Sequence, residues 1–225
     1  MNQVHLIDCM EFMRDLPDHH YDLAIVDPPY GIGINGSVGG EKLAKVKKYI
    51  NKGWDTKPPD KEYFNELYRI SRNQIIWGAN HFISKIPYDS PAWIVWNKEN
   101  SGYFADCELA WTSFSTAVRM FTYRWNGMLQ GNMKNKELRI HETQKPVALY
   151  KWILKNYAKP NDKIFDSHVG SGSIRIACHD MGFDFEGCEI DGDYWQAQED
   201  RYQEHILQPT LFEPVLPTYE QRDIF

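Results

Sequence analysis

The sequence predicts an α/β fold, in which a mostly parallel β-sheet is covered by helices on both faces. Near the end of the chain, a strand pattern at Lys163–Asp166 is followed by a glycine-bearing turn, a helical pattern and a second strand at Phe185–Ile190. This order is typical of one half of a nucleotide-binding sheet. Strand and helix patterns alternate over the rest of the chain as well, without an internal repeat. We therefore expect one domain over residues 1–207 and a tail over residues 208–225.

In the first half of the chain, short apolar runs predict strands and apolar residues at helical spacing predict helices. The strands are expected at Val4–Ile7, Tyr21–Val26, Gln74–Trp77 and Ala92–Trp96. The helices are expected at Met10–Leu16, which Pro17 ends, and at Asp60–Ser71, with Asp60 as the N-cap.

In the second half, further strands are expected within residues 108–140. Pro146 is suited to a first helical position, and apolar residues follow it at helical spacing as far as Tyr157. Two more helices are expected, at Ile174–Met181, closed by Gly182, and at Asp193–Leu207.

The composition is that of a globular protein and excludes several other classes. Of its 225 residues, 42% are hydrophobic and 14% aromatic, which argues against disorder. The four cysteines are scattered without a CxxC pair, so neither a disulfide framework nor a zinc site is indicated, and we expect no metal. Without a signal-peptide pattern or an apolar run long enough for a membrane span, we expect a cytoplasmic protein.

The net charge of −6 hides an uneven distribution. From residue 180 onward there are 12 acidic and 2 basic residues, so the remainder of the chain carries a net positive charge. Basic residues gather in two segments that could contact phosphates: Lys42, Lys45, Lys47 and Lys48, and then Arg119, Arg124, Lys134, Lys136 and Arg139. A solvated charged surface is the alternative reading of both segments.

Two glycine motifs differ in their context. Gly31-x-Gly33-x-x-Gly36 follows two prolines and precedes no apolar helical pattern, so we interpret residues 31–57 as a long mobile loop. The motif from Asp166 through His168, Gly170, Ser171 and Gly172 to Ser173 has the strand before it and the helix after it that a ligand-binding turn requires. Glu189 ends the next strand, where a carboxylate can accept both hydroxyls of a ribose, so an adenosine-containing cofactor is favoured.

The tetrapeptide Asp27-Pro28-Pro29-Tyr30 follows a buried strand pattern. A proline carbonyl and an aspartate can each accept one hydrogen of an amino group, and Tyr30 could stack on the ring that carries this group. A surface turn without further role is the alternative reading.

Together with His141-Glu-Thr-Gln-Lys-Pro146 and the turn from Phe165 to Gly172, this tetrapeptide makes the chain resemble the DNA amino-methyltransferases of the β group. The resemblance extends from Asp8 to about Tyr202. It implies a Rossmann-like fold dependent on S-adenosylmethionine, with a circularly permuted motif order in which the catalytic motif comes first. It also implies methylation of N6 of a flipped adenine in double-stranded DNA, at specific sites, as in restriction–modification systems.

The resemblance carries roles to individual positions. Asp8 is expected near the adenine of the cofactor, Glu189 at its ribose, and Asp166, Gly170 and Gly172 at its methionine part. Thr143 and Lys145 match the motif that precedes the helix over the methionine end. The complete set of expected cofactor-binding residues is Asp8, Thr143, Lys145, Asp166, His168, Gly170, Ser171, Gly172, Ser173 and Glu189.

The chain departs from the family pattern in two places. Ser167 and His168 replace the usual Pro-Phe after the aspartate, which puts the packing role of His168 in question and could loosen cofactor binding. The segment that normally contains the target-recognition domain is short here, at residues 113–140, so specificity could be relaxed or could depend on a partner subunit.

Several alternatives remain open at this point. Methylation of N4 of cytosine would use the same motif, although a leading Asp favours adenine in this family. An inactive DNA-binding regulator, an RNA substrate and an NAD dehydrogenase are further readings, the last disfavoured because Arg175 stands where a third glycine is needed. A homodimer is possible, and Gln208-Pro-Thr-Leu211-Phe212 resembles a peptide that docks on sliding clamps.

Overall fold

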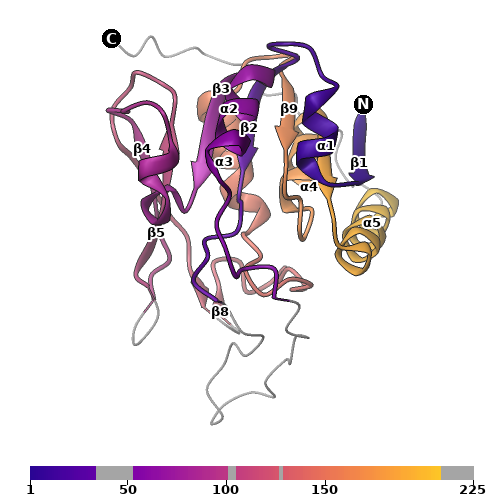
Figure 1. The fold of residues 1–225 in the computed structure, drawn as a ribbon. Helices are drawn as coiled ribbons and strands as arrows, with labels where there is room; N and C mark the ends of the chain where they lie inside the picture. Colours follow the sequence, from indigo (N-terminus) through magenta and orange to yellow (C-terminus); the bar gives the residue numbers. More distant parts are fainter. Residues whose placement is uncertain (34–52, 101–104, 127–128, 209–225) are drawn as a thin grey trace.

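The computed structural model describes residues 1–33, 53–100, 105–126 and 129–208 (Figure 1). Within these ranges the strands of the main sheet are β1 (Asn2–Leu6), β2 (Tyr21–Val26), β3 (Ser71–Trp77), β4 (Trp93–Asn97), β5 (Cys107–Thr112), β6 (Arg119–Thr122), β9 (Lys163–Asp166) and β10 (Asp184–Glu189). A small ribbon pairs β7 (Trp125–Asn126) with β8 (Leu129–Gln130). The α-helices are α1 (Cys9–Arg14), α2 (Lys61–Ile70), α3 (Val147–Tyr157), α4 (Ser173–Met181) and α5 (Gly192–Leu207).

The eight strands follow the order β1-β10-β9-β2-β3-β5-β4-β6. The five strands from β1 to β3 are parallel, whereas β5 runs antiparallel to both of its neighbours. The strands β9 and β2 are neighbours in the sheet. The connection after β9 leads to β10 on one side, and the connection after β2 leads to β3 on the other side, so the two connections diverge. In open α/β sheets such a switch point is where ligands bind, at the carboxyl ends of the strands.

The sheet separates two hydrophobic layers. In β2, Leu23 and Ile25 pack in the layer that contains α3 and α4, whereas Ala24 and Val26 pack in the layer of α1 and α2. Successive strand residues point to opposite faces, so both faces of a central strand must be apolar when helices cover both. The fold class predicted from the sequence is confirmed.

The local signals at the helix ends are mostly confirmed. The Asp60 side chain accepts a hydrogen bond from the backbone of Tyr63, and Gly182 closes α4 in a left-handed conformation with a φ of 75°. Pro146 is the N-cap of α3 and not its first helical residue, so this helix begins one position later than predicted. No helix in the described ranges has both the length and the apolar character that a membrane crossing requires.

Two predicted segments lie largely or wholly outside the described residues. Most of the loop over 31–57 falls within residues 34–52, and the tail with its clamp-like peptide begins at residue 208, after which the structure describes nothing. The short segment 113–140 contributes β6 and the β7–β8 ribbon, and its assignment to target recognition stays a prediction.

Candidate active site

Asp27 follows the last residue of β2 directly, at the switch point of the sheet. Its Oδ1 accepts a hydrogen bond of 2.8 Å from the hydroxyl of Tyr30, so the predicted tetrapeptide folds into a turn closed by its own side chains. Pro28 is buried and has no N–H to leave unsatisfied.

The ring of Tyr30 lies between the end of β3 and a short helical turn, Ala79–His81. Gly78 adopts a φ of 67°, and a β-carbon at this position would overlap the Tyr30 ring. His81 is exposed and stacks on Tyr30, with ring centroids 5.1 Å apart and planes inclined by 17°. His81 thus lies against the aromatic member of the tetrapeptide.

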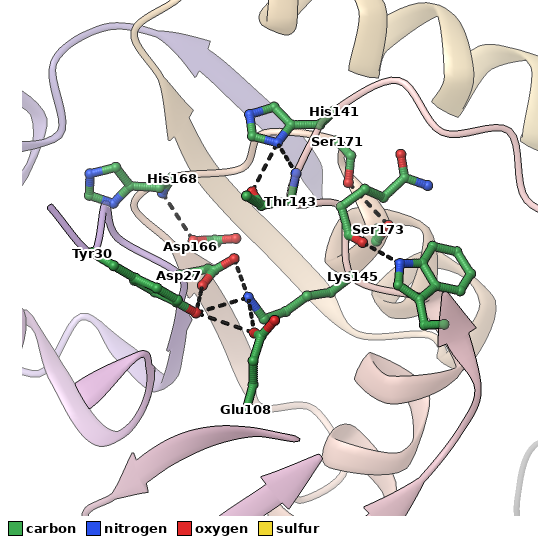
Figure 2. Close-up of polar contacts among 12 residues, drawn as sticks. Asp27, Tyr30, Glu108, His141, Thr143, Lys145, Asp166, His168, Ser171 and Ser173 are labelled. Atoms are coloured by element: carbon green, nitrogen blue, oxygen red, sulfur yellow. Dashed lines mark hydrogen bonds and ion pairs between the residues drawn. The ribbon is translucent and has the colours of Figure 1, made fainter. Parts of the chain in front are cut away.

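Four charged side chains, Asp27, Lys145, Glu108 and Lys98, are joined in series at the site. Figure 2 shows the first three. The ammonium of Lys145 contacts Asp27 Oδ2 and lies 3.1 Å from Glu108 Oε2. The other oxygen of Glu108 is paired with Lys98. Lys145 is 2% exposed in its side chain, so its two carboxylate partners replace the water that a buried ammonium lacks.

Burial and ion pairing have opposing effects on the pKa values of these charged groups. Burial alone would raise the pKa of Glu108, but the ammonium groups of Lys145 and Lys98 hold it at about 2. Burial raises the pKa of Asp27 above its usual value, and Glu108 adds to this while Lys145 opposes it. Burial would lower the pKa of Lys145, but its carboxylate partners raise it, so the ammonium keeps its proton.

Glu108 and Lys98 were not among the residues predicted from the sequence. Because β5 is antiparallel, its first residues lie at the sheet edge where β3 and β4 end, and Glu108 pairs in register with Trp96. A signal was present, since Glu108 alternates with Ala110, which is buried in the core. A carboxylate on the apolar face of a strand marks a site or a buried ion pair.

The glycine turn between β9 and α4 adopts conformations that favour glycine. Gly170 and Gly172 have φ values of 51° and 71°. The Glu189 carboxylate accepts one hydrogen bond from the backbone of Gly170 and another from Asp191, each 2.9 Å long. Glu189 therefore fixes the turn, and its carboxylate, with about four acceptor positions, can still accept a further donor.

Ser171 and Ser173 face each other across the turn, with their hydroxyl oxygens 3.2 Å apart. Arg201 of α5 donates to the carbonyl of Ser171 and to the hydroxyl of Ser173, and it also pairs with Glu137 at 2.8 Å. Arg201 thus fixes both serines to α5. Through its pair with Glu137 it also connects the turn to the segment 113–140.

Asp166 ends β9 and is almost fully buried. Its carboxylate accepts the backbone N–H of His168 at 3.0 Å. Burial raises its pKa to about 8, a shift to which Asp27 and Glu189 contribute. A buried acid with this pKa is poised to ionise when a cation is placed beside it.

Ser167 and His168, which depart from the family pattern, are linked with Tyr63 in a chain of hydrogen bonds. Tyr63 Oη lies 2.6 Å from Ser167 Oγ, which lies 2.8 Å from Nδ1 of His168. Burial lowers the pKa of His168 to about 4, so the ring is neutral. With Tyr63 donating to Ser167 and Ser167 to Nδ1, the remaining ring nitrogen carries the proton.

His141 and Thr143 lie above the glycine turn. Nδ1 of His141 accepts the backbone N–H of Thr143 at 3.3 Å, and the Thr143 hydroxyl lies 3.1 Å from the same atom. A β-carbon at Gly170 would lie 3.7 Å from the His141 ring. Trp54 and Tyr194 pack on His141, with ring centroids 5.3 and 4.3 Å away. Trp54 was not predicted, because it lies within the segment interpreted as a loop.

A pocket opens at the carboxyl ends of β1, β9 and β10. Its lining consists of Ile7, Asp8, Cys9, Ser167, His168, Glu189 and Ile190. Three of the predicted cofactor residues meet here, with apolar groups to cover a purine and a carboxylate to accept hydroxyls. Asp8 has a structural task as well, since it caps α1 by accepting the backbone N–H groups of Met10 and Glu11.

Lys145 is placed differently from the other predicted cofactor residues, because its ammonium lies on Asp27. Across the described part of the chain, no group of three His, Cys, Asp or Glu side chains is arranged for a metal ion.

Five of the nine predicted DNA-contacting residues lie within the described ranges. Lys42, Lys45, Lys47 and Lys48 lie outside the described residues. Arg124, Lys134 and Lys136 are exposed, while Arg139 packs over the Trp125 ring at 4.5 Å. Arg119 begins β6 and pairs in register with Ile94 inside β4, so it lies back from the edge that carries Asp27.

Comparison with known proteins adds independent findings. Residues 95–200 match a family model described as DNA methylase. The type II methyltransferase M.HinfI of Haemophilus influenzae is 25% identical, over 88% of this chain and 67% of its own length.

Two solved structures share the fold. The M1.HpyAVI–SAM complex aligns with a TM-score of 0.58 and 22% identity, over 89% of this chain and all of that one. The PvuII DNA methyltransferase, described as cytosine-N4-specific, aligns with a TM-score of 0.59 and 10% identity, over 89% and 86%. The resemblance to DNA amino-methyltransferases and the Rossmann-like methyltransferase fold are confirmed.

Proposed function

Starting from this similarity to the DNA methylases, we propose that the chain transfers the methyl group of S-adenosylmethionine to N6 of adenine in double-stranded DNA. The observation that supports this most strongly is the position of Asp27-Pro28-Pro29-Tyr30. It follows β2 beside the glycine turn of β9, at the switch point of the sheet. An acceptor for an amino group and a cofactor turn are thus neighbours.

The residues of the pocket fit the proposed cofactor. The Glu189 carboxylate is held by backbone N–H groups and retains acceptor capacity for a ribose hydroxyl. Ile7 and Ile190 offer apolar contact to adenine, and His168 offers a ring N–H. Asp166 lies beside the glycine turn, where a cationic methionine part would stabilise its ionised form. When bound, the cofactor supplies a methyl group activated by the positive charge on sulfur.

Asp27 and the Pro28 carbonyl would act on the target base. The lone pair of an exocyclic amino nitrogen is delocalised into the ring, so this nitrogen is a poor nucleophile. Hydrogen bonds from its two hydrogens to Asp27 and Pro28 favour a tetrahedral nitrogen, and burial strengthens them. Fixed alignment of the amino group then supplies the entropic part of catalysis.

The target base would leave the duplex to reach this edge of the sheet, at a cost of a few kcal/mol. Tyr30 would stack on it, supported from the other side by His81. The exposed Arg124, Lys134 and Lys136, with the lysines of residues 42–48, would contact phosphates. The choice of adenine over cytosine rests on the resemblance, since a leading Asp in the tetrapeptide favours adenine in that family.

The test is methyl transfer from labelled S-adenosylmethionine into DNA, followed by identification of the methylated base. We expect N6-methyladenine. In Asp27→Ala the rate should fall at least about 100-fold, because a buried acceptor for the reacting group is lost. Cofactor affinity measured by calorimetry should stay within about threefold.

The matched control is Asp18→Ala, since the Asp18 side chain is 72% exposed and pairs with Arg69 away from the site. It should methylate as the parent does. Labelled N4-methylcytosine would show that the target base is cytosine. Label found in RNA alone would show that the substrate is RNA. No label in any nucleic acid would favour an inactive regulator.

A further inference from the structure

Both oxygens of Asp27 already have partners. Oδ1 accepts from the Tyr30 hydroxyl at 2.8 Å, and Oδ2 contacts the Lys145 ammonium. Lys145 Nζ also lies 3.2 Å from the Tyr30 oxygen, so the ammonium is seated inside the tetrapeptide turn. It occupies the hydrogen-bonding position that the proposed reaction reserves for the target amino group.

The competition is direct, because both groups present a nitrogen with hydrogens to the same carboxylate. A charged donor forms the stronger bond, so an amino group gains this position only if the ammonium has another acceptor. A buried ammonium left without one would carry a large desolvation cost.

Glu108 is that acceptor. Its Oε2 lies 3.1 Å from Lys145 Nζ, and its Oε1 is held by Lys98. Lys98 comes directly after β4, and Glu108 of β5 pairs in register with Trp96 of β4. The two paired strands therefore hold the Glu108 carboxylate in place. Glu108 can therefore receive Lys145 without itself moving toward Asp27.

We propose that Lys145 exchanges partners during the reaction, with Glu108 as the positioning residue that takes it over. Before the base enters, Lys145 bridges Asp27 and Glu108. When the target amino group donates to Asp27 Oδ2, the ammonium shifts onto Glu108 and stays within the cluster. The inference rests on the proposed function, since it concerns the same Asp27 acceptor.

The exchange predicts opposite effects for two substitutions of the same cluster. In Glu108→Gln the ammonium keeps only Asp27 as a charged partner, so it competes more strongly with the base. We expect kcat to fall about tenfold or more, with cofactor affinity unchanged. Adding Lys145→Met to Glu108→Gln removes the competitor, so the double variant should be faster than Glu108→Gln alone.

Lys145→Met by itself should change the pH profile. Asp27 would then face Glu108 without the intervening cation, and repulsion between the two carboxylates would favour protonated Asp27. Because only ionised Asp27 accepts the amino group, the rise of kcat with pH should move to higher pH than in the parent. In the double variant, which lacks the Glu108 charge, this displacement should be smaller.

The control is Glu199→Gln on α5, which also removes a carboxylate from a buried cation, Arg175, at 2.5 Å. It should lower the melting temperature and leave kcat unchanged. If the parent protein is active, two results would overturn the exchange. One is a kcat of Glu108→Gln equal to that of the parent, and the other is a double variant that is no faster than Glu108→Gln. An inactive parent would instead overturn the proposed function.

Discussion

Gly78 packs against the ring of Tyr30 so closely that no β-carbon fits between them. Gly78 directly follows β3, and its lack of a side chain leaves the space that the Tyr30 ring occupies. Tyr30 holds Asp27 by a hydrogen bond, so Gly78 affects the acceptor through one intermediate side chain.

We expect Gly78→Ala to impair methylation far more than it impairs cofactor binding, because the displaced Tyr30 ring would move Asp27. Both Gly78 and Gly182 have φ near +70°, but a β-carbon at Gly182 would meet no atom within 4 Å. Gly182→Ala therefore imposes only the backbone strain, about 1 kcal/mol. Equal methylation rates in the two variants, compared at equal folded fraction, would contradict this role of Gly78.

Cofactor binding should release a proton from Asp166. Its pKa is about 8 in the free protein, so the group is mostly protonated at pH 7, and a cationic ligand beside it would favour ionisation. The bound state then holds fewer protons, and affinity should rise as pH increases toward 8. Calorimetry in buffers of different ionisation enthalpy measures this release, and Asp166→Asn should abolish it. Heats that do not depend on the buffer would exclude it.

His168 should contribute to destabilisation in acid. Its folded pKa of about 4 lies below the value of about 6.5 for an unfolded histidine, so the unfolded chain binds more protons between these limits. Stability is therefore lost as pH falls from 6.5 to 4, by up to about 3 kcal/mol from this group. Urea unfolding at pH 7 and pH 4.5 should show a smaller loss in His168→Phe. An equal loss would mean that the ring is readily protonated when folded.

The lysines of residues 42–48 should contribute to DNA affinity mainly through phosphates. Changing Lys42, Lys45, Lys47 and Lys48 to Gln should weaken binding and reduce the slope of log affinity against log salt by about 0.9 for each lysine that contacts a phosphate. The control changes Lys155, Lys159 and Lys163, which are exposed; Lys163 begins β9 and so lies at the opposite edge from Asp27. An unchanged slope in the first variant would leave its lysines as a solvated surface.

The parts of the fold that were predictable are those with local signals. Each of these signals depends on residues close in sequence: Asp60 caps α2, Gly182 ends α4, and an apolar run forms β2. These elements lie where the signals predict them. The strand order was not predictable in detail, because the insertion of antiparallel β5 between β3 and β4 depends on pairing between distant segments.

The same distinction applies to the site. Asp27, Gly170 and Glu189 stand in motifs. Glu108, in contrast, contacts Lys145 and Lys98, and the pairing of β4 with β5 brings Lys98 and Glu108 together. His168 could be recognised as a departure from the family pattern, but its support by Tyr63 through Ser167 joins residues 104 positions apart. Motif spacing carries no information about such contacts.

The pocket is built from segments that lie far apart in the sequence: Ile7, Asp8 and Cys9 follow β1, and Glu189 and Ile190 lie at the end of β10. β1 pairs with no strand other than β10 in the described sheet. During synthesis, the first strand thus emerges from the ribosome long before its partner exists, and the pocket cannot form on a chain shorter than about 190 residues. A chain that stops before β10 therefore lacks part of the pocket lining, and it would present β1 as an unpaired edge open to association with other chains.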